Sequence, residues 1–372
     1  MPTVFEHFWN RVNAATQRAD EYGLPANIAA EAKRYALQLA KLALDLHVDN
    51  QDPARPLITE MIGPTMKWGW DNPYTTYHYA PLDDHIAYQF FGSRNDSIYL
   101  GVTIYGEGNE RGGEMPKLVL GSFNDNDITF DSHGRFNITL DPSVATRTGD
   151  VLPLPTGASS IIIRQYFSHP LSQTASMVRL EPVTPSGPPP LLTDEALSER
   201  VVAATRFFDA MWGMSDVVVG RITQAPANVF HPPLPGGLDP QGRPSGHMYP
   251  TVDNLYVFGN YEVQDDEILV VEVTPPPCRY WSFYLGSVLQ QSHPYGSGYG
   301  LYTRDNAATG PDGSVRFHIS ANNPGVDNWL STAGHVRGMM AMRFLLAEVD
   351  TPPVPTCRVE KLRNFKSGAE GN

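Results

Sequence analysis

Short runs of β-branched and aromatic residues, separated by only a few turn residues, recur along this chain from about residue 68 onward. Ile86–Phe91 and Ile98–Tyr105 are clear examples, and the turn-forming pair Asn95-Asp96 lies between them. Such runs are typical of β-strands. Connections this short leave no room for the crossover helices that parallel strands require. The sequence therefore predicts a mainly β protein with antiparallel pairing, arranged as two β-sandwich domains.

The other expected strands form two groups on either side of a proline-rich stretch. In the first group, strands are expected at residues 117–122, 127–131, 135–140, 159–167 and 176–182. In the second group, strands are expected at residues 255–262, 267–273, 279–286, 314–320, 338–347 and 356–361. Aromatic residues make up 10% of the chain and glycine and proline together 65 residues, as many short strands joined by turns require.

Two regions show a helical period instead. Between residues 3 and 48, apolar residues recur every three to four positions on both sides of Gly23-Leu24-Pro25, which predicts an N-terminal helical hairpin. Thr193 is expected to cap a linking helix that runs to about Met214. The acidic residues Asp194 and Glu195 stand in its first turn, where the helix dipole favours negative charge.

These patterns divide the chain into four parts. We expect a helical hairpin at 1–50, a first β-sandwich domain at 51–182, a proline-rich linker with a helix and a long loop at 183–250, and a second β-sandwich domain at 251–372. Proline fixes φ and removes a hydrogen-bond donor, so the run Pro188-Pro189-Pro190 makes the linker stiff and extended.

Charge and motif content narrow the classes of function. With 27 Lys and Arg against 40 Asp and Glu, the net charge is −13, which disfavours nucleic acid as a partner. Without a signal-peptide pattern or a membrane-length apolar run, we expect a cytoplasmic protein that contacts no membrane. Its two cysteines, Cys278 and Cys357, should then be reduced. A small-molecule substrate or ligand is the expected partner, and self-association into a homo-oligomer is left open.

Metal and cofactor motifs are absent from the sequence. The eleven histidines form no HxH or HExxH motif and show no His with carboxylates at ligand spacing. Neither a glycine-rich phosphate loop nor a GxSxG nucleophile elbow occurs. We therefore expect no metal and no cofactor.

Two turns have similar sequences. Asp131–Phe136 and Thr309–Phe317 each contain a glycine turn that leads into a strand with an arginine and an aromatic residue. The match indicates either a weak internal duplication of sandwiches or hairpin chemistry that many proteins share. The local similarity alone favours hairpin chemistry.

Four pieces of the second half carry a resemblance to a known family. They are Tyr280–Gly286, Asp312-Gly313, Asn323–His335 and Met342–Phe344. In order and spacing they resemble the bacterial domain-of-unknown-function family 1214 over roughly residues 250–362. The Asn-Trp-Leu-x-Thr-Ala-Gly-His run within Asn323–His335 is the specific part.

The first half is similar, more loosely, to the amino-terminal region of full-length members of that family. The carriers are Asn72-Pro73, Tyr77, Ala80, Leu82-Asp83, Tyr88, Gly92 and Ile163–Phe167. Tyr74-Thr75-Thr76 stands where members more often have Asp-Asn-Leu or Asp-Thr-Leu. The resemblance implies jelly-roll-like β-sandwiches joined by helices. It implies no established reaction, and a fold alone does not supply one.

Asn328, Trp329, His335 and Arg343 form the strongest chemical grouping in the sequence. His335 could act as a general acid or base near neutral pH, Asn328 could orient a ligand, and Arg343 could hold an anion or a carbonyl. Alternatively, each residue has a purely structural role: Asn328 caps a turn, His335 donates one hydrogen bond to a carbonyl, and Arg343 pairs with a carboxylate. The structural role is favoured for Asn328 and Arg343. For His335, the functional and the structural interpretations are evenly balanced.

Other candidates lie in the first half. Strand alternation places Arg164 and Tyr166 on one face, as a pocket wall or as a buried structural pair. An aromatic cluster around Asp71-Asn72-Pro73 suggests a loop that holds a ligand, or one that packs the second helix onto the sandwich. Its members are Trp68, Trp70, Tyr74, Tyr77 and Tyr79, with Asn72 as a polar contact. Trp281 is a further candidate contact, although core packing is its more natural role.

Two functions follow from these candidates. The first is a cofactor-independent enzyme, hydrolase-like or lyase-like, that acts on a small hydroxylated or aromatic compound in a cleft between the two sandwiches. His335, Arg164 and Arg343 are its candidate catalytic residues, and its candidate substrate contacts are Asn72, Tyr77, Tyr79, Tyr166, Trp281, Asn328 and Trp329. The alternative is a non-catalytic protein that binds carbohydrate or another small ligand.

Overall fold

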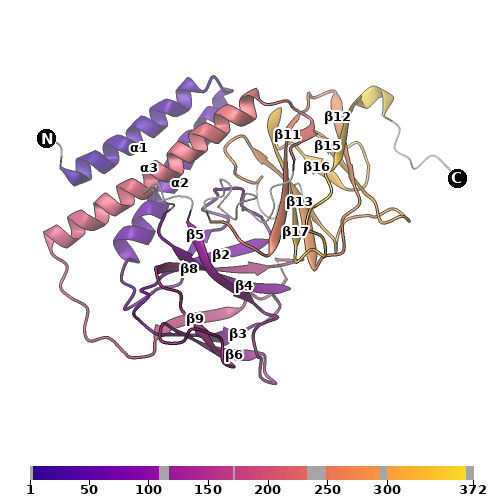
Figure 1. The fold of residues 1–372 in the computed structure, drawn as a ribbon. Coiled ribbons are helices and arrows are strands. Elements are labelled where there is room, and N and C mark those ends of the chain that lie inside the picture. The colour runs from indigo at the N-terminus through magenta and orange to yellow at the C-terminus, as the bar shows by residue number, and fades with distance from the viewer. Residues whose placement is uncertain (1–2, 109–116, 171, 233–248, 294–299, 366–372) are drawn as a thin grey trace. The chain divides into compact units, whose positions relative to one another are not determined.

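A computed structural model describes residues 3–108, 117–170, 172–232, 249–293 and 300–365 of the chain. Within them, four β-sheets and three α-helices confirm the mainly β fold class (Figure 1). The strands form two groups, coloured purple to magenta and orange to yellow in Figure 1, and each group makes one sandwich of two sheets.

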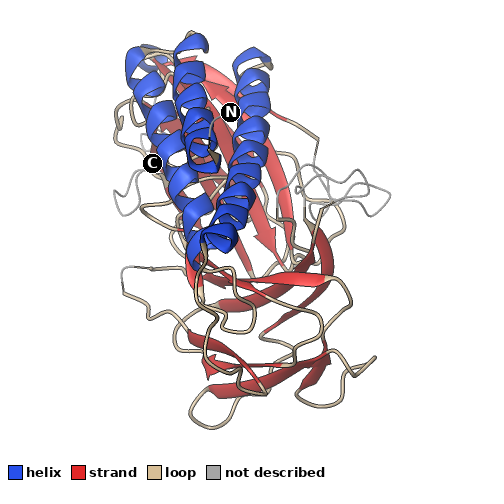
Figure 2. Cartoon of the chain, turned by 90° about the vertical axis from the view of Figure 1, so that its left-hand side faces the viewer, coloured by secondary structure: helices blue, strands red, loops and turns tan. Residues whose placement is uncertain are grey.

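The predicted helical hairpin and linking helix are both present and appear in blue in Figure 2. Helix α1 spans Val4–Glu21 and helix α2 spans Ala26–Leu44, with a short π-helix at Asp45–Asp49. The Thr3 hydroxyl accepts a bond from the Glu6 amide at 3.2 Å, which caps α1. Helix α3 covers Asp194–Gln224 and so continues beyond the end expected at Met214.

The described residues of the first sandwich form nine strands. They are β1 (Thr59–Ile62), β2 (Thr75–Pro81), β3 (Tyr88–Ser93), β4 (Tyr99–Gly106), β5 (Leu118–Asn124), β6 (Arg135–Asp141), β7 (Val151–Pro153), β8 (Ala158–Tyr166) and β9 (Met177–Pro182). One sheet has the order β1-β2-β8-β4-β5 and the other has the order β7-β6-β3-β9. All pairs are antiparallel except the short pair β6–β7.

In the second sandwich, the part of the chain that the structure describes also forms nine strands. They are β10 (Val229–Phe230), β11 (Asn254–Glu262), β12 (Glu267–Val273), β13 (Tyr280–Ser287), β14 (Leu301–Thr303), β15 (Val315–Ser320), β16 (Trp329–Ser331), β17 (Arg337–Leu345) and β18 (Thr356–Lys361). Their orders are β10-β11-β17-β13-β14 and β16-β15-β12-β18. Among these described strands, β15–β16 is the one parallel pair. A 3₁₀ turn at Leu362–Asn364 follows β18.

The two sandwiches have the same topology. Each strand of the first sandwich has its counterpart nine strands later, so that both sheet orders repeat, and the parallel pair β6–β7 repeats as β15–β16. Registers repeat as well. Tyr77 pairs with Arg164 in the first sandwich, and Tyr256 pairs with Arg343 in the second. The fold is therefore an internal duplication.

The two similar turns lie at equivalent places in this duplication, although Arg135 and Arg316 are not equivalent positions, so hairpin chemistry stays the interpretation of their Arg-aromatic match. Both turns immediately precede equivalent strands, β6 and β15. In the first, the amide of Gly134 donates to the Asp131 carbonyl at 3.0 Å, and in the second, the amide of Gly313 donates to the Gly310 carbonyl at 3.0 Å. Both glycines have positive φ, 72° and 78°, which L side chains rarely adopt.

Each sandwich has its own hydrophobic core between its two sheets. Ile161 and Ile163 of β8 point into the first core, and their counterparts Met340 and Met342 of β17 point into the second. Residues of these strands that alternate with them, including Arg164 and Arg343, lie on the opposite face. We call this the outer face of each five-stranded sheet.

The chain divides into two compact units, one for each sandwich, and the second unit is discontinuous. The first consists of Met1–Met66 and Tyr74–Met214, and the second of Lys67–Pro73 and Ser215–Asn372. The segment Lys67–Pro73, which the sequence pattern places in the first sandwich, thus makes its contacts within the second unit.

Some expected elements differ in the structure. Residues 127–131 form the end of a turn and irregular backbone instead of a strand. The aromatic cluster expected on a loop is split, because Tyr77 and Tyr79 belong to strand β2 while Trp68 and Trp70 belong to the segment Lys67–Pro73. No helix among the described residues is both long and apolar enough to cross a lipid bilayer.

Candidate functional site

The described residues of the second sandwich line a groove. Its volume is about 620 Å³, within the range of small-molecule sites. The hairpin before β15, the strand β15 itself and the turn before β16 form its walls. Its lining residues are Glu272, Ala308, Thr309, Gly310, Pro311, Asp312, Ser314, Val315, Arg316, His318, Asp327 and Asn328.

Asn328 holds two walls of the groove together. Its side-chain oxygen accepts from the Ala308 amide at 2.8 Å, and its side-chain nitrogen donates to the carbonyls of Ala308 and Arg316 at 2.7 and 3.0 Å. The backbone of Asn328 has a positive φ of 51°, a conformation that asparagine tolerates better than most residues. Asn328 therefore lies at the groove, but its side chain is hydrogen-bonded to backbone groups of Ala308 and Arg316.

His318 is a groove residue that the sequence motifs do not indicate. It lies on β15 beside Asn328, is only 9% exposed, and its Nδ1 lies 2.8 Å from the carbonyl oxygen of Asp327. A carbonyl oxygen accepts only, so Nδ1 carries the proton and the neutral ring has its lone pair on Nε2. Burial lowers the pKa of His318, which favours this neutral form.

Carboxylates dominate the charge of the groove. Glu272 accepts from Arg316 and Arg358, both at 2.6 Å, and these bonds, that of Arg358 foremost, lower its pKa. Asp312 accepts from the Ser314 hydroxyl at 2.6 Å, and this bond lowers the pKa of Asp312. Asp327 lines the groove with an exposed side chain.

The outer face of the second five-stranded sheet carries Arg343. Its Nε donates to the Tyr284 hydroxyl at 3.0 Å, and its guanidinium lies 5.2 Å from the centre of the Tyr256 ring. Arg343 also donates to the carbonyl oxygen of Trp70, which accepts from the Tyr284 hydroxyl at 2.9 Å. Nearby, the Asn72 amide donates to the Ser282 hydroxyl at 3.2 Å. The segment Lys67–Pro73 thus lies on this outer face.

Two charged residues of that segment hold one dipeptide of the second unit. The ammonium of Lys67 donates to the carbonyls of Ser292 and His293 at 2.8 and 2.7 Å. The carboxylate of Asp71 accepts from the amide and hydroxyl of Ser292 at 2.8 and 2.6 Å. These groups are buried, where such bonds fix geometry strongly.

The dipeptide positions a pair of histidine rings. The rings of His293 and His335 lie 5.1 Å apart between centres, and His293 Nε2 lies 3.3 Å from the Tyr261 hydroxyl. Burial, with the nearby charges of His335 and Lys67, holds the pKa of His293 well below its usual 6.5. His335 is buried and follows β16, with its amide donating to the Thr332 carbonyl at 2.9 Å.

The outer face of the first sandwich carries the equivalent arginine. Arg164 donates to the hydroxyls of Thr103 and Tyr105 at 3.1 and 3.0 Å, and its guanidinium lies 5.9 Å from the centre of the Tyr77 ring. Tyr166 is fully buried on the same face, edge-on to Tyr99 at 5.2 Å between ring centres. The shared Arg-Tyr face expected from strand alternation is therefore present.

The remaining candidates have packing contacts. Trp281 lies in the second hydrophobic core, edge-on to Phe317 at 6.1 Å. Trp329 is half-buried on β16, and its indole donates to the Ser320 hydroxyl at 2.9 Å. Tyr79 is half-buried on β2, and burial raises its pKa. Binding roles for these three residues stay predictions.

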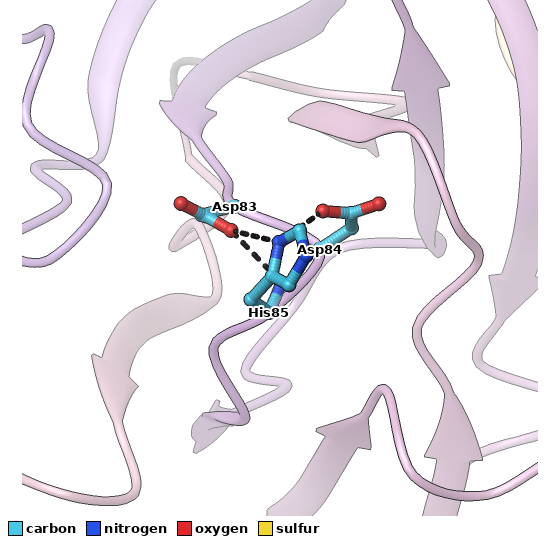
Figure 3. Close-up of side chains that lie close together, drawn as sticks. All are labelled: Asp83, Asp84 and His85. Carbon is cyan, nitrogen blue, oxygen red and sulfur yellow. Dashed lines mark hydrogen bonds and ion pairs between the residues drawn. The ribbon is translucent and has the colours of Figure 1, made fainter.

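Asp83, Asp84 and His85 form a further cluster, at the end of β2 (Figure 3). Their ligand-type atoms lie within 4.8 Å of one another, although the sequence shows no metal-ligand spacing there. His85 Nδ1 lies 3.1 Å from Asp83 and 2.7 Å from Asp84, and the bond to Asp83, with the charge of Asp84, raises its pKa. An ion pair accounts for this arrangement, and the expected absence of a metal stays a prediction.

The structure thus defines a duplicated double β-sandwich protein with a polar groove on its second sandwich. Residues 264–349 match the model of the family described as Protein of unknown function (DUF1214), which confirms the resemblance in the second half. The looser likeness of the first half stays a prediction. No curated protein matches the chain.

Two solved structures share the fold. A putative uncharacterized protein from Burkholderia cenocepacia is 25% identical, with a TM-score of 0.83 over 96% of this chain and 98% of that one. The VPA0106 protein from Vibrio parahaemolyticus is 11% identical, with a TM-score of 0.51 over 88% of this chain and 98% of that one.

Proposed function

We propose that this chain binds a small hydroxylated compound in the groove of its second sandwich. The observation that carries the proposal is the cavity of about 620 Å³, which combines several hydrogen-bonding side chains with the exposed apolar surfaces of Ala308 and Pro311. One of its residues, Asn328, begins the sequence run that most specifically carries the family resemblance, and Asp327 directly precedes that run.

Filling the groove tests this proposal. Ala308 is exposed at the groove wall, so Ala308→Trp places an indole inside it. Ala145, which is exposed on the equivalent sandwich, supplies the matched control Ala145→Trp. We expect glucose or catechol to shift groove amides in NMR spectra of the full chain and of the control, and to shift none in Ala308→Trp. Neither probe shifting a groove amide, or equal shifts in Ala308→Trp, would contradict the proposal.

A cofactor-independent hydrolase-like or lyase-like enzyme is the second candidate. The paired rings of His293 and His335 favour it, because a neutral imidazole beside a second imidazole can accept or relay a proton. If His335 is the acid or base, His335→Gln should lower turnover by about 100-fold or more while the melting temperature stays near that of the native chain. A lowered melting temperature with unchanged turnover per folded molecule would assign His335 a structural role.

A further inference from the structure

We infer that the groove selects ligands by their hydrogen-bond donors, and that it takes neutral or amino-substituted polyols of monosaccharide size and rejects anionic ones. This inference rests on the proposed function, since it names the class of compound that the same groove binds. It assigns His318, Asp312 and Asp327 as the residues that set specificity.

The first step concerns His318. Its Nδ1 is bonded to the Asp327 carbonyl, and Nε2 has no hydrogen-bond partner among the described residues. The side chain is 91% buried at the groove wall, with the ring of Phe365 5.5 Å away between centres. A neutral imidazole in this tautomer offers a single lone pair at Nε2, so it accepts a bond from a ligand hydroxyl.

The second step concerns the charged groups around His318. Glu272, Asp312 and Asp327 supply three negative charges and Arg316 supplies one positive charge, so the lining has a net charge of −2 with His318 neutral. Because Glu272 is held by Arg316 and Arg358, the carboxylates of Asp312 and Asp327 are the ones placed to meet a ligand. Carboxylates accept and repel other anions, so the groove favours donors and disfavours a carboxylate or a phosphate.

The third step is a dependence on pH. Burial lowers the pKa of His318, Arg316 and Arg358 lower it further, and its bond to the Asp327 backbone opposes them. His318 is therefore neutral at pH 7 and gains a proton as the pH falls. Protonation turns Nε2 into a donor, so affinity for a hydroxyl that donates to Nε2 should decline as the pH falls through the lowered pKa of His318.

The closing experiment uses three sugars that share one scaffold: glucose, glucosamine and glucuronate. They are titrated into the full-length chain at pH 7, and groove amides are followed by NMR. We expect glucose and glucosamine to bind at the groove, and glucuronate to bind at least about fivefold more weakly. Glucose affinity should fall by about three- to tenfold, the effect of one hydrogen bond, once the pH is below the lowered pKa of His318, and His318→Thr, which copies the equivalent Thr139, should abolish that pH dependence.

Variants of the acidic residues complete the test. Asp327→Asn should weaken glucosamine about two- to fivefold while glucose changes less, and Asp350→Asn, an exposed carboxylate outside the groove, should change neither. Glucuronate binding as tightly as glucose at groove amides would overturn the inference and leave the proposed function standing. Groove shifts with catechol but with none of the sugars would do the same. No groove shifts with catechol or any sugar would overturn both.

Discussion

The two sandwiches share one topology but differ in the chemistry of one surface. The groove residues Glu272, Arg316 and His318 of the second sandwich have Phe91, Asn137 and Thr139 as their counterparts in the first. The framework around them is the same, since the amide of Thr139 donates to the Asp150 carbonyl at 2.9 Å and that of His318 to the Asn328 carbonyl at 3.0 Å. The duplicated backbone is thus compatible with different side chains at the groove position, and only the second set gives a charged, acceptor-rich wall.

The inner faces of the two sandwiches, in contrast, are alike in chemistry, because both cores are apolar and closely packed. Phe283 is fully buried in the second core, 4.3 Å from the ring of Phe317, and its counterpart Val102 is buried in the first. Phe283→Ala should lower the free energy of unfolding by about 3–5 kcal/mol, and Val102→Ala by about 2 kcal/mol. Urea unfolding of both variants measures these losses. A larger loss from Val102→Ala would show that the cores are not equivalent in packing.

The equivalent outer-face arginines provide the next test. Arg343→Ala removes one of the two donors to the Trp70 carbonyl and the donor that Arg343 supplies to the Tyr284 hydroxyl. Arg164→Ala removes the donors that Arg164 supplies to the hydroxyls of Thr103 and Tyr105. Each substitution should cost about 2–3 kcal/mol of unfolding free energy.

Arg179 provides the control for both arginine variants. Its side chain is 71% exposed, and Arg179→Ala should change stability by less than about 0.5 kcal/mol. Unchanged melting of either buried-arginine variant in differential scanning calorimetry would contradict the structural role of that guanidinium.

Asn328 and its counterpart Asp150 test the groove framework with reciprocal changes. In Asn328→Asp, the side chain still accepts from the Ala308 amide but no longer donates to the carbonyls of Ala308 and Arg316. We expect a loss of about 2 kcal/mol. Asp150 is exposed, so Asp150→Asn should have almost no effect. Equal effects of the two substitutions in urea unfolding would show that Asn328 is not the structural centre of the turn.

The smallest expected effect is a dependence of stability on pH through His293. Its pKa lies well below 6.5 in the folded chain because of burial, so below pH 6.5 the unfolded chain binds a proton that the folded chain does not. Stability is therefore lost as the pH falls, by about 1 kcal/mol between pH 6.5 and pH 5.5. His293→Gln should remove this part of the slope in urea unfolding at several pH values. A slope identical to that of the native chain would contradict the assignment.

The strand pattern predicted most of the fold because a period of two is local information. Strands of only three residues, such as β7, β14 and β16, are too short to show that period. The sequence pattern did not predict strand β2, because its aromatic residues continue the aromatic cluster that begins at Trp68 and Trp70. The place of Lys67–Pro73 in the second unit depends on partners more than 200 residues away, which no local pattern contains.

The candidate site was predictable only in part. Asn328 was found through its turn-rich motif, and the Arg164 face through strand alternation. His318 was overlooked because it alternates with Phe317 and Ile319 in a run that indicates a buried strand. The same alternation also contains the signal, since it puts His318 beside Arg316 on the face turned away from the core.

The discontinuity of the second unit has a consequence for the order of events during synthesis. Asp71 and its partner Ser292 are 221 residues apart in the chain. At about 5–20 residues per second, Ser292 is made roughly 10–45 seconds after Asp71. During that interval, the part of the second sandwich that buries Lys67 and Asp71 has not yet been synthesised. Completion of this unit is therefore a late, high-contact-order step, and we expect it to be slower than closure of the helical hairpin, whose contacts are local.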